Sequence, residues 1–240
     1  MEKRYRGSFF GLVWVVLYPV LFLSIYLFVY LVVFKIRVPG LSTLDYVVYI
    51  FAGLVPYIAF METVNGSAIS IKQNAHLIRN VILPAELLPT RVVTTALVTE
   101  AVGLVLVAVL SAINGSLSLH LAMLPIAIAI QVTFLLGVAL LLAPLGLMVP
   151  DVPYFTGLLI FFLLFVSPIS WKPSAVPAHL RIMVWINPIY YLLLPFRMAM
   201  LTVEPIRPGD VVLAAVVAIT FFVVGAWFFL RLKPSLLEYE

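Results

Sequence analysis

The sequence predicts an all-α integral membrane protein with six transmembrane helices. Hydrophobic residues make up 65% of the 240 residues and charged residues only 10%. Soluble domains, in contrast, carry roughly 45–50% apolar and about 25% charged residues. The mean hydropathy is +1.21. Long runs with almost no charge recur along the chain, and each is long enough to cross a hydrocarbon core of about 30 Å.

The predicted spans are residues 9–34, 46–63, 92–113, 121–149, 152–171 and 211–230. The first run has no charge before Lys35. It is too long for a signal peptide, whose apolar region has about 7–15 residues, so we expect this span to be retained. Two prolines in the fourth run, Pro125 and Pro144, predict a bend or a late start of that helix.

The stretch 178–204 is apolar but interrupted. Asn187, Pro188, Pro195 and Arg197 leave no continuous length for a span. Because backbone in contact with lipid must satisfy its own polar groups, we expect two short re-entrant helices before the last span.

Basic residues predict the orientation. Lys3, Arg4 and Arg6 precede the first span, and Arg231 and Lys233 follow the last. Cytoplasmic flanks are enriched in such residues, so we expect both termini in the cytoplasm. The net charge of +4 is consistent with loops that contact anionic membrane lipid. No basic run alternates with aromatic residues, and we expect no nucleic-acid partner.

The segment 67–80 resembles a short amphipathic helix on the cytoplasmic side. Its apolar face includes Ile71 and Ile78. Lys72, His76 and Arg79 form a stripe beside that face, and Asn74 lies on the polar side. One interpretation is an interfacial helix that rests on lipid headgroups. The other is a docking helix for a cytoplasmic partner, and the pattern does not separate the two.

Two carboxylates lie within or at the end of predicted spans. Glu62 ends the second span and Glu100 lies inside the third. A carboxylate at such depth faces a partner or a cavity. Glu100 therefore pairs with a basic group, lines a polar path, or forms a structural hydrogen bond between helices.

Aromatic residues recur every four positions along the first span. Between Phe10 and Phe34 they are Trp14, Tyr18, Phe22, Tyr26 and Tyr30. Each step of four advances the helix face by about 40°, so the rings form a slow spiral. Interfacial belts explain the outer rings. The inner rings favour a wall for a substrate with sugar or lipid surfaces.

Motifs for catalysis are missing from the sequence. It has no GxxxxGK[ST] loop, no HExxH and no GxSxG. Cysteine is absent, and the histidines have no metal-ligand spacing. We therefore expect no catalytic residue, metal site or bound cofactor in this chain. Any energy source would come from another chain or an ion gradient.

Five runs of residues, in the same order, resemble the ABC-2 type permeases that export polysaccharides such as O-antigen, capsule and teichoic acid. They are RYRGSFFGLVW at 4–14, FAGLVPY at 51–57, NAHLIRNVILPAELLP at 74–89, SPI at 167–169 and NPI at 187–189. The resemblance covers nearly the whole chain. Relatives carry an interface helix before the first run, where this sequence has three residues, and Arg-Asp where it has Pro150-Asp151.

The resemblance implies a homodimer in the bacterial inner membrane with two copies of an ATPase that uses ATP and Mg²⁺. The substrate would be a glycan on undecaprenyl diphosphate. The segment 67–80 would be the coupling helix, Arg4 and Arg6 the N-terminal gate, and Asn187, Pro188 and Arg197 part of the re-entrant region. An ABC-2 exporter of a drug, peptide or lipid is the alternative. A membrane enzyme acting on carrier lipids is a remote third hypothesis.

Overall fold

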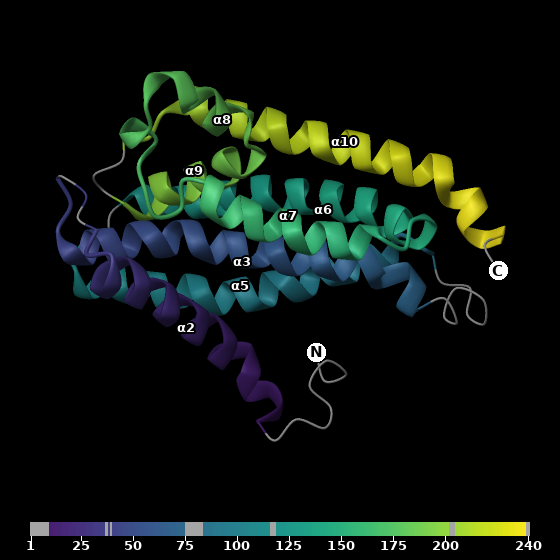
Figure 1. Ribbon diagram of the computed structural model, residues 1–240, viewed down its shortest axis with the longest axis horizontal. Coiled ribbons are helices and arrows are strands. Elements are labelled where there is room, and N and C mark those ends of the chain that lie inside the picture. Colours follow the sequence, from purple (N-terminus) through teal and green to yellow (C-terminus); the bar gives the residue numbers. More distant parts are fainter. Residues whose placement is uncertain are drawn as a thin grey trace.

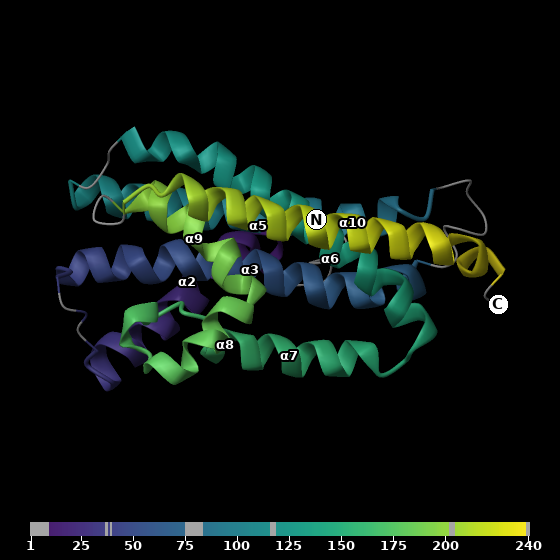
Figure 2. The ribbon, with the colours of Figure 1, turned by 90° about the horizontal axis from the view of Figure 1, so that it is seen from above.

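The structure, a computed structural model, describes residues 10–36, 38, 40–74, 84–115, 119–201 and 205–238. Every regular element in these ranges is a helix, and the predicted all-α fold class is confirmed. Five of the described helices are long and apolar enough to cross a membrane, or six if a bent pair counts as one span. Figures 1 and 2 show the long helices running along one another, and Figure 1 shows α2 leaving the bundle obliquely.

The main helices are α2 (Trp14–Leu27), α3 (Thr43–Gln73), α5 (Leu87–Ile113), α6 (Leu124–Met148), α7 (Val152–Val166), α8 (Arg181–Ile186), α9 (Pro188–Met200) and α10 (Pro208–Glu238). A π-helical turn, η2 (Phe28–Val33), continues α2. The short 3₁₀ turns are η1 (Gly11–Val13), η3 (Leu119–Met123), η4 (Pro173–Ala175) and η5 (Ala178–Leu180).

Helix α3 is the centre of the bundle. It packs against α5, α6, α7 and α9, and 89% of its most apolar window is buried, against 17% for α2 and α10. Ser42 and Asp45 start the helix with a capping box, in which each side chain bonds the backbone N–H of the other. The apolar surface of α3 faces protein on nearly all sides, whereas α2 and α10 present much of theirs outward.

Helix crossings are closest at small residues. A Cβ atom added to Gly146 in α6 would lie 1.7 Å from the carbonyl oxygen of Ala68 in α3. A Cβ atom added to Gly225 in α10 would lie 2.1 Å from the carbonyl oxygen of Gly137 in α6. Such contacts between backbones are typical of helix pairs in membranes, where dispersion over closely packed surfaces drives association.

Several helix boundaries differ from the predicted spans, and α5, for example, begins at Leu87 rather than at residue 92. Helix α3 continues to Gln73, so its last turns include the first half of the segment 67–80. Helix α10 begins at Pro208 and extends to Glu238. Helix α7 ends at Val166, after 15 residues, where a span was predicted over 152–171. Ser167 is extended because the proline that follows it disfavours helical backbone.

The stretch 178–204 forms two short helices within the described residues. The pair Ala178–Ile186 and Pro188–Met200 is bent by 87° at Asn187. Asn187 accepts a hydrogen bond from the backbone N–H of Ile189, and Pro188 occupies the first turn of α9. The predicted interruption at Asn187 and Pro188 is therefore the start of α9, since Asn is a preferred N-cap and Pro suits the first helical turn.

Candidate functional site

Residues 167–171, which we call the clamp segment, connect α7 to the turns before α8 without helical backbone. Their carbonyl groups are bonded by side chains from distant elements. The Tyr46 hydroxyl donates to the carbonyl of Ser170 at 2.8 Å, and the Tyr49 hydroxyl donates to that of Trp171 at 3.0 Å. Irregular backbone at membrane depth is tolerated only where protein satisfies its polar groups. The two tyrosines of α3 provide that for the clamp segment.

Arg197 of α9 is the central residue of this region. It is 3% exposed. Its Nη2 donates to the carbonyls of Pro168 and Ile169, the latter at 2.9 Å. Its guanidinium lies 3.9 Å from the centroid of the Tyr49 ring, a cation–π contact. A buried cation therefore joins α9, α3 and the clamp segment.

Asn187 completes this network. Its Nδ2 donates to the hydroxyl of Ser167 at 2.9 Å, while its Oδ1 caps α9. The fold thus brings Asn187, Pro188 and Arg197 to the same end of the bundle as the clamp segment. These three residues were predicted from the sequence, whereas Tyr46 and Tyr49 were not, because they look like ordinary members of an apolar run.

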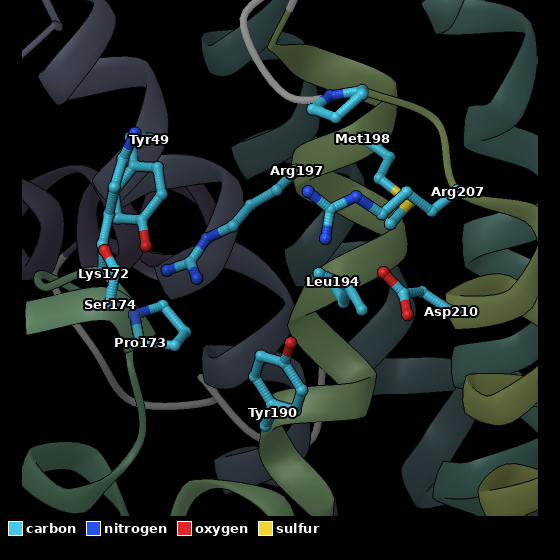
Figure 3. Close-up of a pocket in the computed structure, with 11 residues that line it drawn as sticks. Tyr49, Lys172, Pro173, Ser174, Tyr190, Leu194, Arg197, Met198, Arg207 and Asp210 are labelled. Atoms are coloured by element: carbon cyan, nitrogen blue, oxygen red, sulfur yellow. The ribbon is translucent and has the colours of Figure 1, made fainter. Parts of the chain in front are cut away.

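A cavity of about 280 Å³ opens beside Arg197. Figure 3 shows side chains from α3, α9, the loop after the clamp segment and the start of α10 around it. Its lining residues are Tyr49, Lys172, Pro173, Ser174, Tyr190, Leu194, Arg197, Met198, Pro205, Arg207 and Asp210. We call this cavity the basic pocket, because three cationic side chains and one carboxylate line it. Lys172 and Arg207 were not among the predicted site residues, since each stands alone in the sequence.

The aromatic spiral is present on α2 and η2 as pairs of rings in contact. Tyr26 and Tyr30 stack with centroids 4.5 Å apart, and Tyr18 and Phe22 stack at 6.2 Å. Tyr26 is buried, Trp14, Phe22 and Tyr30 are half-buried, and Tyr18 is exposed. Within one chain these rings lie along a helix surface. Their predicted role in a substrate path stays a prediction.

The opposite end of the bundle contains the predicted docking residues. Ile71 is buried against α5, α6 and α10, Lys72 is exposed, and Asn74 donates to the carbonyl of Ser70 at 2.8 Å. His76, Ile78 and Arg79 lie outside the described residues, as do Arg4 and Arg6 of the predicted gate. The part of 67–80 that the structure describes thus belongs mainly to α3, with Ile71 inside the bundle.

An ion pair that no sequence pattern predicted lies at this end of the bundle. Lys233 of α10 contacts Glu86, just before α5, with nitrogen–oxygen distances of 3.0 Å. The pKa of Glu86 is lowered chiefly by a hydrogen bond from its own backbone N–H, with Lys233 adding to the effect and partial burial opposing it. The pair links two helix ends that are 147 residues apart in sequence.

The two predicted intramembrane carboxylates have different surroundings. Glu62 accepts a hydrogen bond from the Thr99 hydroxyl at 3.3 Å. Glu100 is 2% exposed, and neither of its oxygens has a hydrogen-bond partner among the described residues. Gln131 of α6, which was not among the predicted site residues, donates to the carbonyl of Pro56 at 3.3 Å. The side-chain oxygen of Gln131 has no hydrogen-bond partner among the described residues. A polar layer thus crosses the apolar interior between α3, α5 and α6.

Comparison with known proteins identifies the family. The family model described as ABC-2 type transporter matches residues 1–201. An O-antigen export system permease protein RfbA of Myxococcus xanthus is 28% identical over 200 residues, which are 82% of this chain and 75% of that protein. A protein of the same name from Klebsiella pneumoniae is 27% identical over 199 residues, with the same coverage.

These matches agree with the apolar helices of the structure, and they make the chain a multi-pass protein of the bacterial inner membrane. The matched residues, 1–201, include the clamp segment and all of α9 with Arg197. The chain therefore belongs to the ABC-2 type transporter family.

Proposed function

We propose that this chain is the permease subunit of an ATP-driven exporter that moves a lipid-linked polysaccharide of the O-antigen type across the inner membrane. The observation that carries the proposal is the likeness to permeases named for O-antigen export, which covers 82% of this chain. The multi-helix architecture is consistent with it. In this proposal two copies of a partner ATPase bind and hydrolyse ATP with Mg²⁺.

Gene deletion tests the cargo. In a strain that makes a surface polysaccharide, deletion of this gene is expected to abolish the surface glycan and to accumulate its lipid-linked precursor inside. Complementation with the wild-type gene is expected to restore the surface glycan and to remove the accumulated precursor. If surface glycan stays at the wild-type level while sensitivity to a drug or peptide rises, the cargo is the second class of substrate and the polysaccharide proposal is wrong.

The ATPase is proposed to dock at the end of the bundle where α3 finishes. Lys72 is exposed there, and the Glu86–Lys233 pair ties α5 and α10 to the same end. Exposed charge at a docking surface steers association and rejects wrong partners. A rigid link between helix ends would transmit the movement of the ATPase to α5 and α10 together.

A charge reversal tests this docking. Lys72→Glu is expected to reduce the ATPase recovered with the tagged permease by about tenfold, as for one like-charge contact in an interface. The matched control is Lys35→Glu, the same charge change on an exposed residue at the opposite end of the bundle. Equal recovery with both variants would place the ATPase elsewhere.

Two copies of the chain are proposed to pair along α2, so that the aromatic residues line the glycan path between them. The support is the poor burial of α2 within one chain, 17% of its most apolar window. Because the chain has no cysteine, Tyr18→Cys alone would report a contact between copies as a disulfide-linked dimer. Phe161→Cys, on the exposed face of α7, is the control. Crosslinking at Phe161→Cys instead of Tyr18→Cys would move the interface to α7.

A further inference from the structure

The basic pocket is placed where a membrane helix begins. Arg207 and Asp210 lie at the start of α10, and the apolar residues Val212, Leu213 and Val216 follow on its exposed surface. Figure 3 shows Arg207 extending from the start of α10 toward α9, whereas Arg197 extends from α9 toward Tyr49 of α3. A polar pocket directly beside an exposed apolar helix matches the boundary between lipid headgroups and acyl chains.

The charges of the pocket favour an anion. Lys172, Arg197 and Arg207 carry three positive charges against the single carboxylate of Asp210. Among the described residues no ion pair joins Arg207 to Asp210, although the two are three positions apart. An excess of cations in a partly enclosed space raises the local concentration of anions.

Arg197 provides a second, independent observation. Two carbonyl groups occupy its Nη2, yet its buried Nε has no acceptor among the described residues. Buried donors are rarely left without a partner in folded proteins, and each exception calls for an explanation. A strong acceptor bound beside Arg197 would change the hydrogen bonding of this guanidinium. It would thereby account for the unpaired Nε donor.

The size of the pocket suits a phosphate group with a substituent. Its volume of about 280 Å³ is several times the ~30 Å³ that one water occupies in the liquid. Tyr190 and Ser174 add hydroxyl donors to the lining. Arginine, lysine and hydroxyl groups together are the donors that bind phosphate oxygens in proteins.

We propose that the basic pocket binds the phosphate of an anionic membrane lipid, with Arg207, Lys172 and Tyr190 on the headgroup and the acyl chains along the exposed face of α10. This inference goes beyond the proposed function, because it concerns a lipid held at the edge of the bundle rather than the transported glycan. A bound lipid here would join the start of α10 to the clamp segment through Arg197.

Lipid binding to the purified full-length chain in detergent tests the proposal. The probes are phosphatidylglycerol and, as a phosphate-free control with the same acyl chains, diacylglycerol, with occupancy measured by native mass spectrometry. The wild-type chain is expected to retain phosphatidylglycerol and not diacylglycerol. Arg207→Gln and Lys172→Gln are each expected to weaken phosphatidylglycerol binding about tenfold, the usual effect of removing one charge-assisted hydrogen bond. Lys35→Gln is the control for charge at the same end of the bundle.

A variant that is expected to tighten lipid binding separates a change at the pocket from misfolding, because a misfolded chain would only lose binding. Asp210→Asn removes the one carboxylate and is expected to tighten phosphatidylglycerol binding several-fold, roughly as for loss of one nearby like charge. Unchanged binding in both Arg207→Gln and Asp210→Asn would overturn the proposal, and so would equal retention of diacylglycerol. Arg197 is left intact throughout because it holds the clamp segment.

Inorganic phosphate distinguishes the two sources of this ligand chemistry. If it displaces no lipid, the site requires the whole lipid. If it binds the wild-type chain without lipid and fails with Arg207→Gln, the pocket is a phosphate site that takes the free anion. These measurements need no transport. A chain that binds lipid as expected but exports no polysaccharide would count against the proposed function alone.

Discussion

The contact between Gly146 and Ala68 yields the sharpest stability prediction. A Cβ atom at position 146 would lie 1.7 Å from the Ala68 carbonyl oxygen, and real Cβ atoms essentially never approach another atom closer than 3.0 Å. Gly146→Ala therefore requires a separation of at least 1.3 Å, the difference between 3.0 and 1.7 Å. The opposing atom belongs to the backbone of α3, so no side-chain rotation relieves the clash.

The magnitude follows from two opposing terms. Overpacking of a well-packed interior costs about 1–3 kcal/mol, and a backbone clash that moves a whole helix belongs at the upper end of that range. Replacing a helical glycine by alanine regains roughly 0.5–1 kcal/mol of conformational entropy. We expect Gly146→Ala to lower the free energy of unfolding by about 2 kcal/mol, the remainder of these two terms.

Gly157→Ala in α7 is the matched control. Nothing lies within 4 Å of a Cβ atom at that position, so only the entropic gain remains. The assay is unfolding of the purified chain by SDS in mixed micelles, followed by tryptophan fluorescence. Gly157→Ala should be at least as stable as the wild type and Gly146→Ala clearly less stable. Equal stability of the two variants would refute the close approach of α6 to α3.

Three further predictions rest on buried or paired charges. Arg197→Gln is expected to lower the free energy of unfolding by about 1–3 kcal/mol, because it leaves buried carbonyls without their donor, and SDS unfolding measures it. Glu100→Gln should fold like the wild type, since it keeps polar atoms in the same volume, whereas Glu100→Lys should reduce the yield of folded protein on size exclusion. The folded-state pKa of Glu86 is lowered, so its stabilising contribution is present at neutral pH and lost as the pH falls below about 4.3, its usual value. Lys233→Gln should weaken this acid dependence by less than ~1 kcal/mol, because both side chains are partly exposed.

Proline and asparagine in the sequence were sufficient to predict several local features. Asn187 and Pro188 predicted the break between α8 and α9, because a proline removes a backbone donor. The structure adds that Asn187 caps α9 and that Pro188 lies in its first turn. Pro168 likewise indicates that α7 ends near Val166. The predicted span ran past this proline, to residue 171, because the apolar run continues beyond it. Proline alone did not decide the backbone, because α9 continues through Pro195, which was expected to interrupt this stretch, and α3 continues through Pro56.

Burial was not predictable from hydropathy. The most apolar window of α2 has a mean hydropathy of 2.4 and is 17% buried, whereas that of α3 has 1.8 and is 89% buried. In water an apolar stripe faces the core, so its period marks the buried side. Lipid is as apolar as the protein interior. In a membrane helix that is apolar on all faces, the sequence pattern therefore does not show which face is buried.

The sequence by itself determined the class of the chain: an all-α membrane protein with short broken helices before the last span. The composition leaves no material for a soluble surface, and lipid accepts only backbone with internal hydrogen bonds. Only the tertiary structure decided which residues form sites. Arg197 meets the clamp segment 28 and 29 residues away, and Lys233 meets Glu86 across 147 residues. These contacts depend on how helices stack, and no local pattern of residue types encodes such distances.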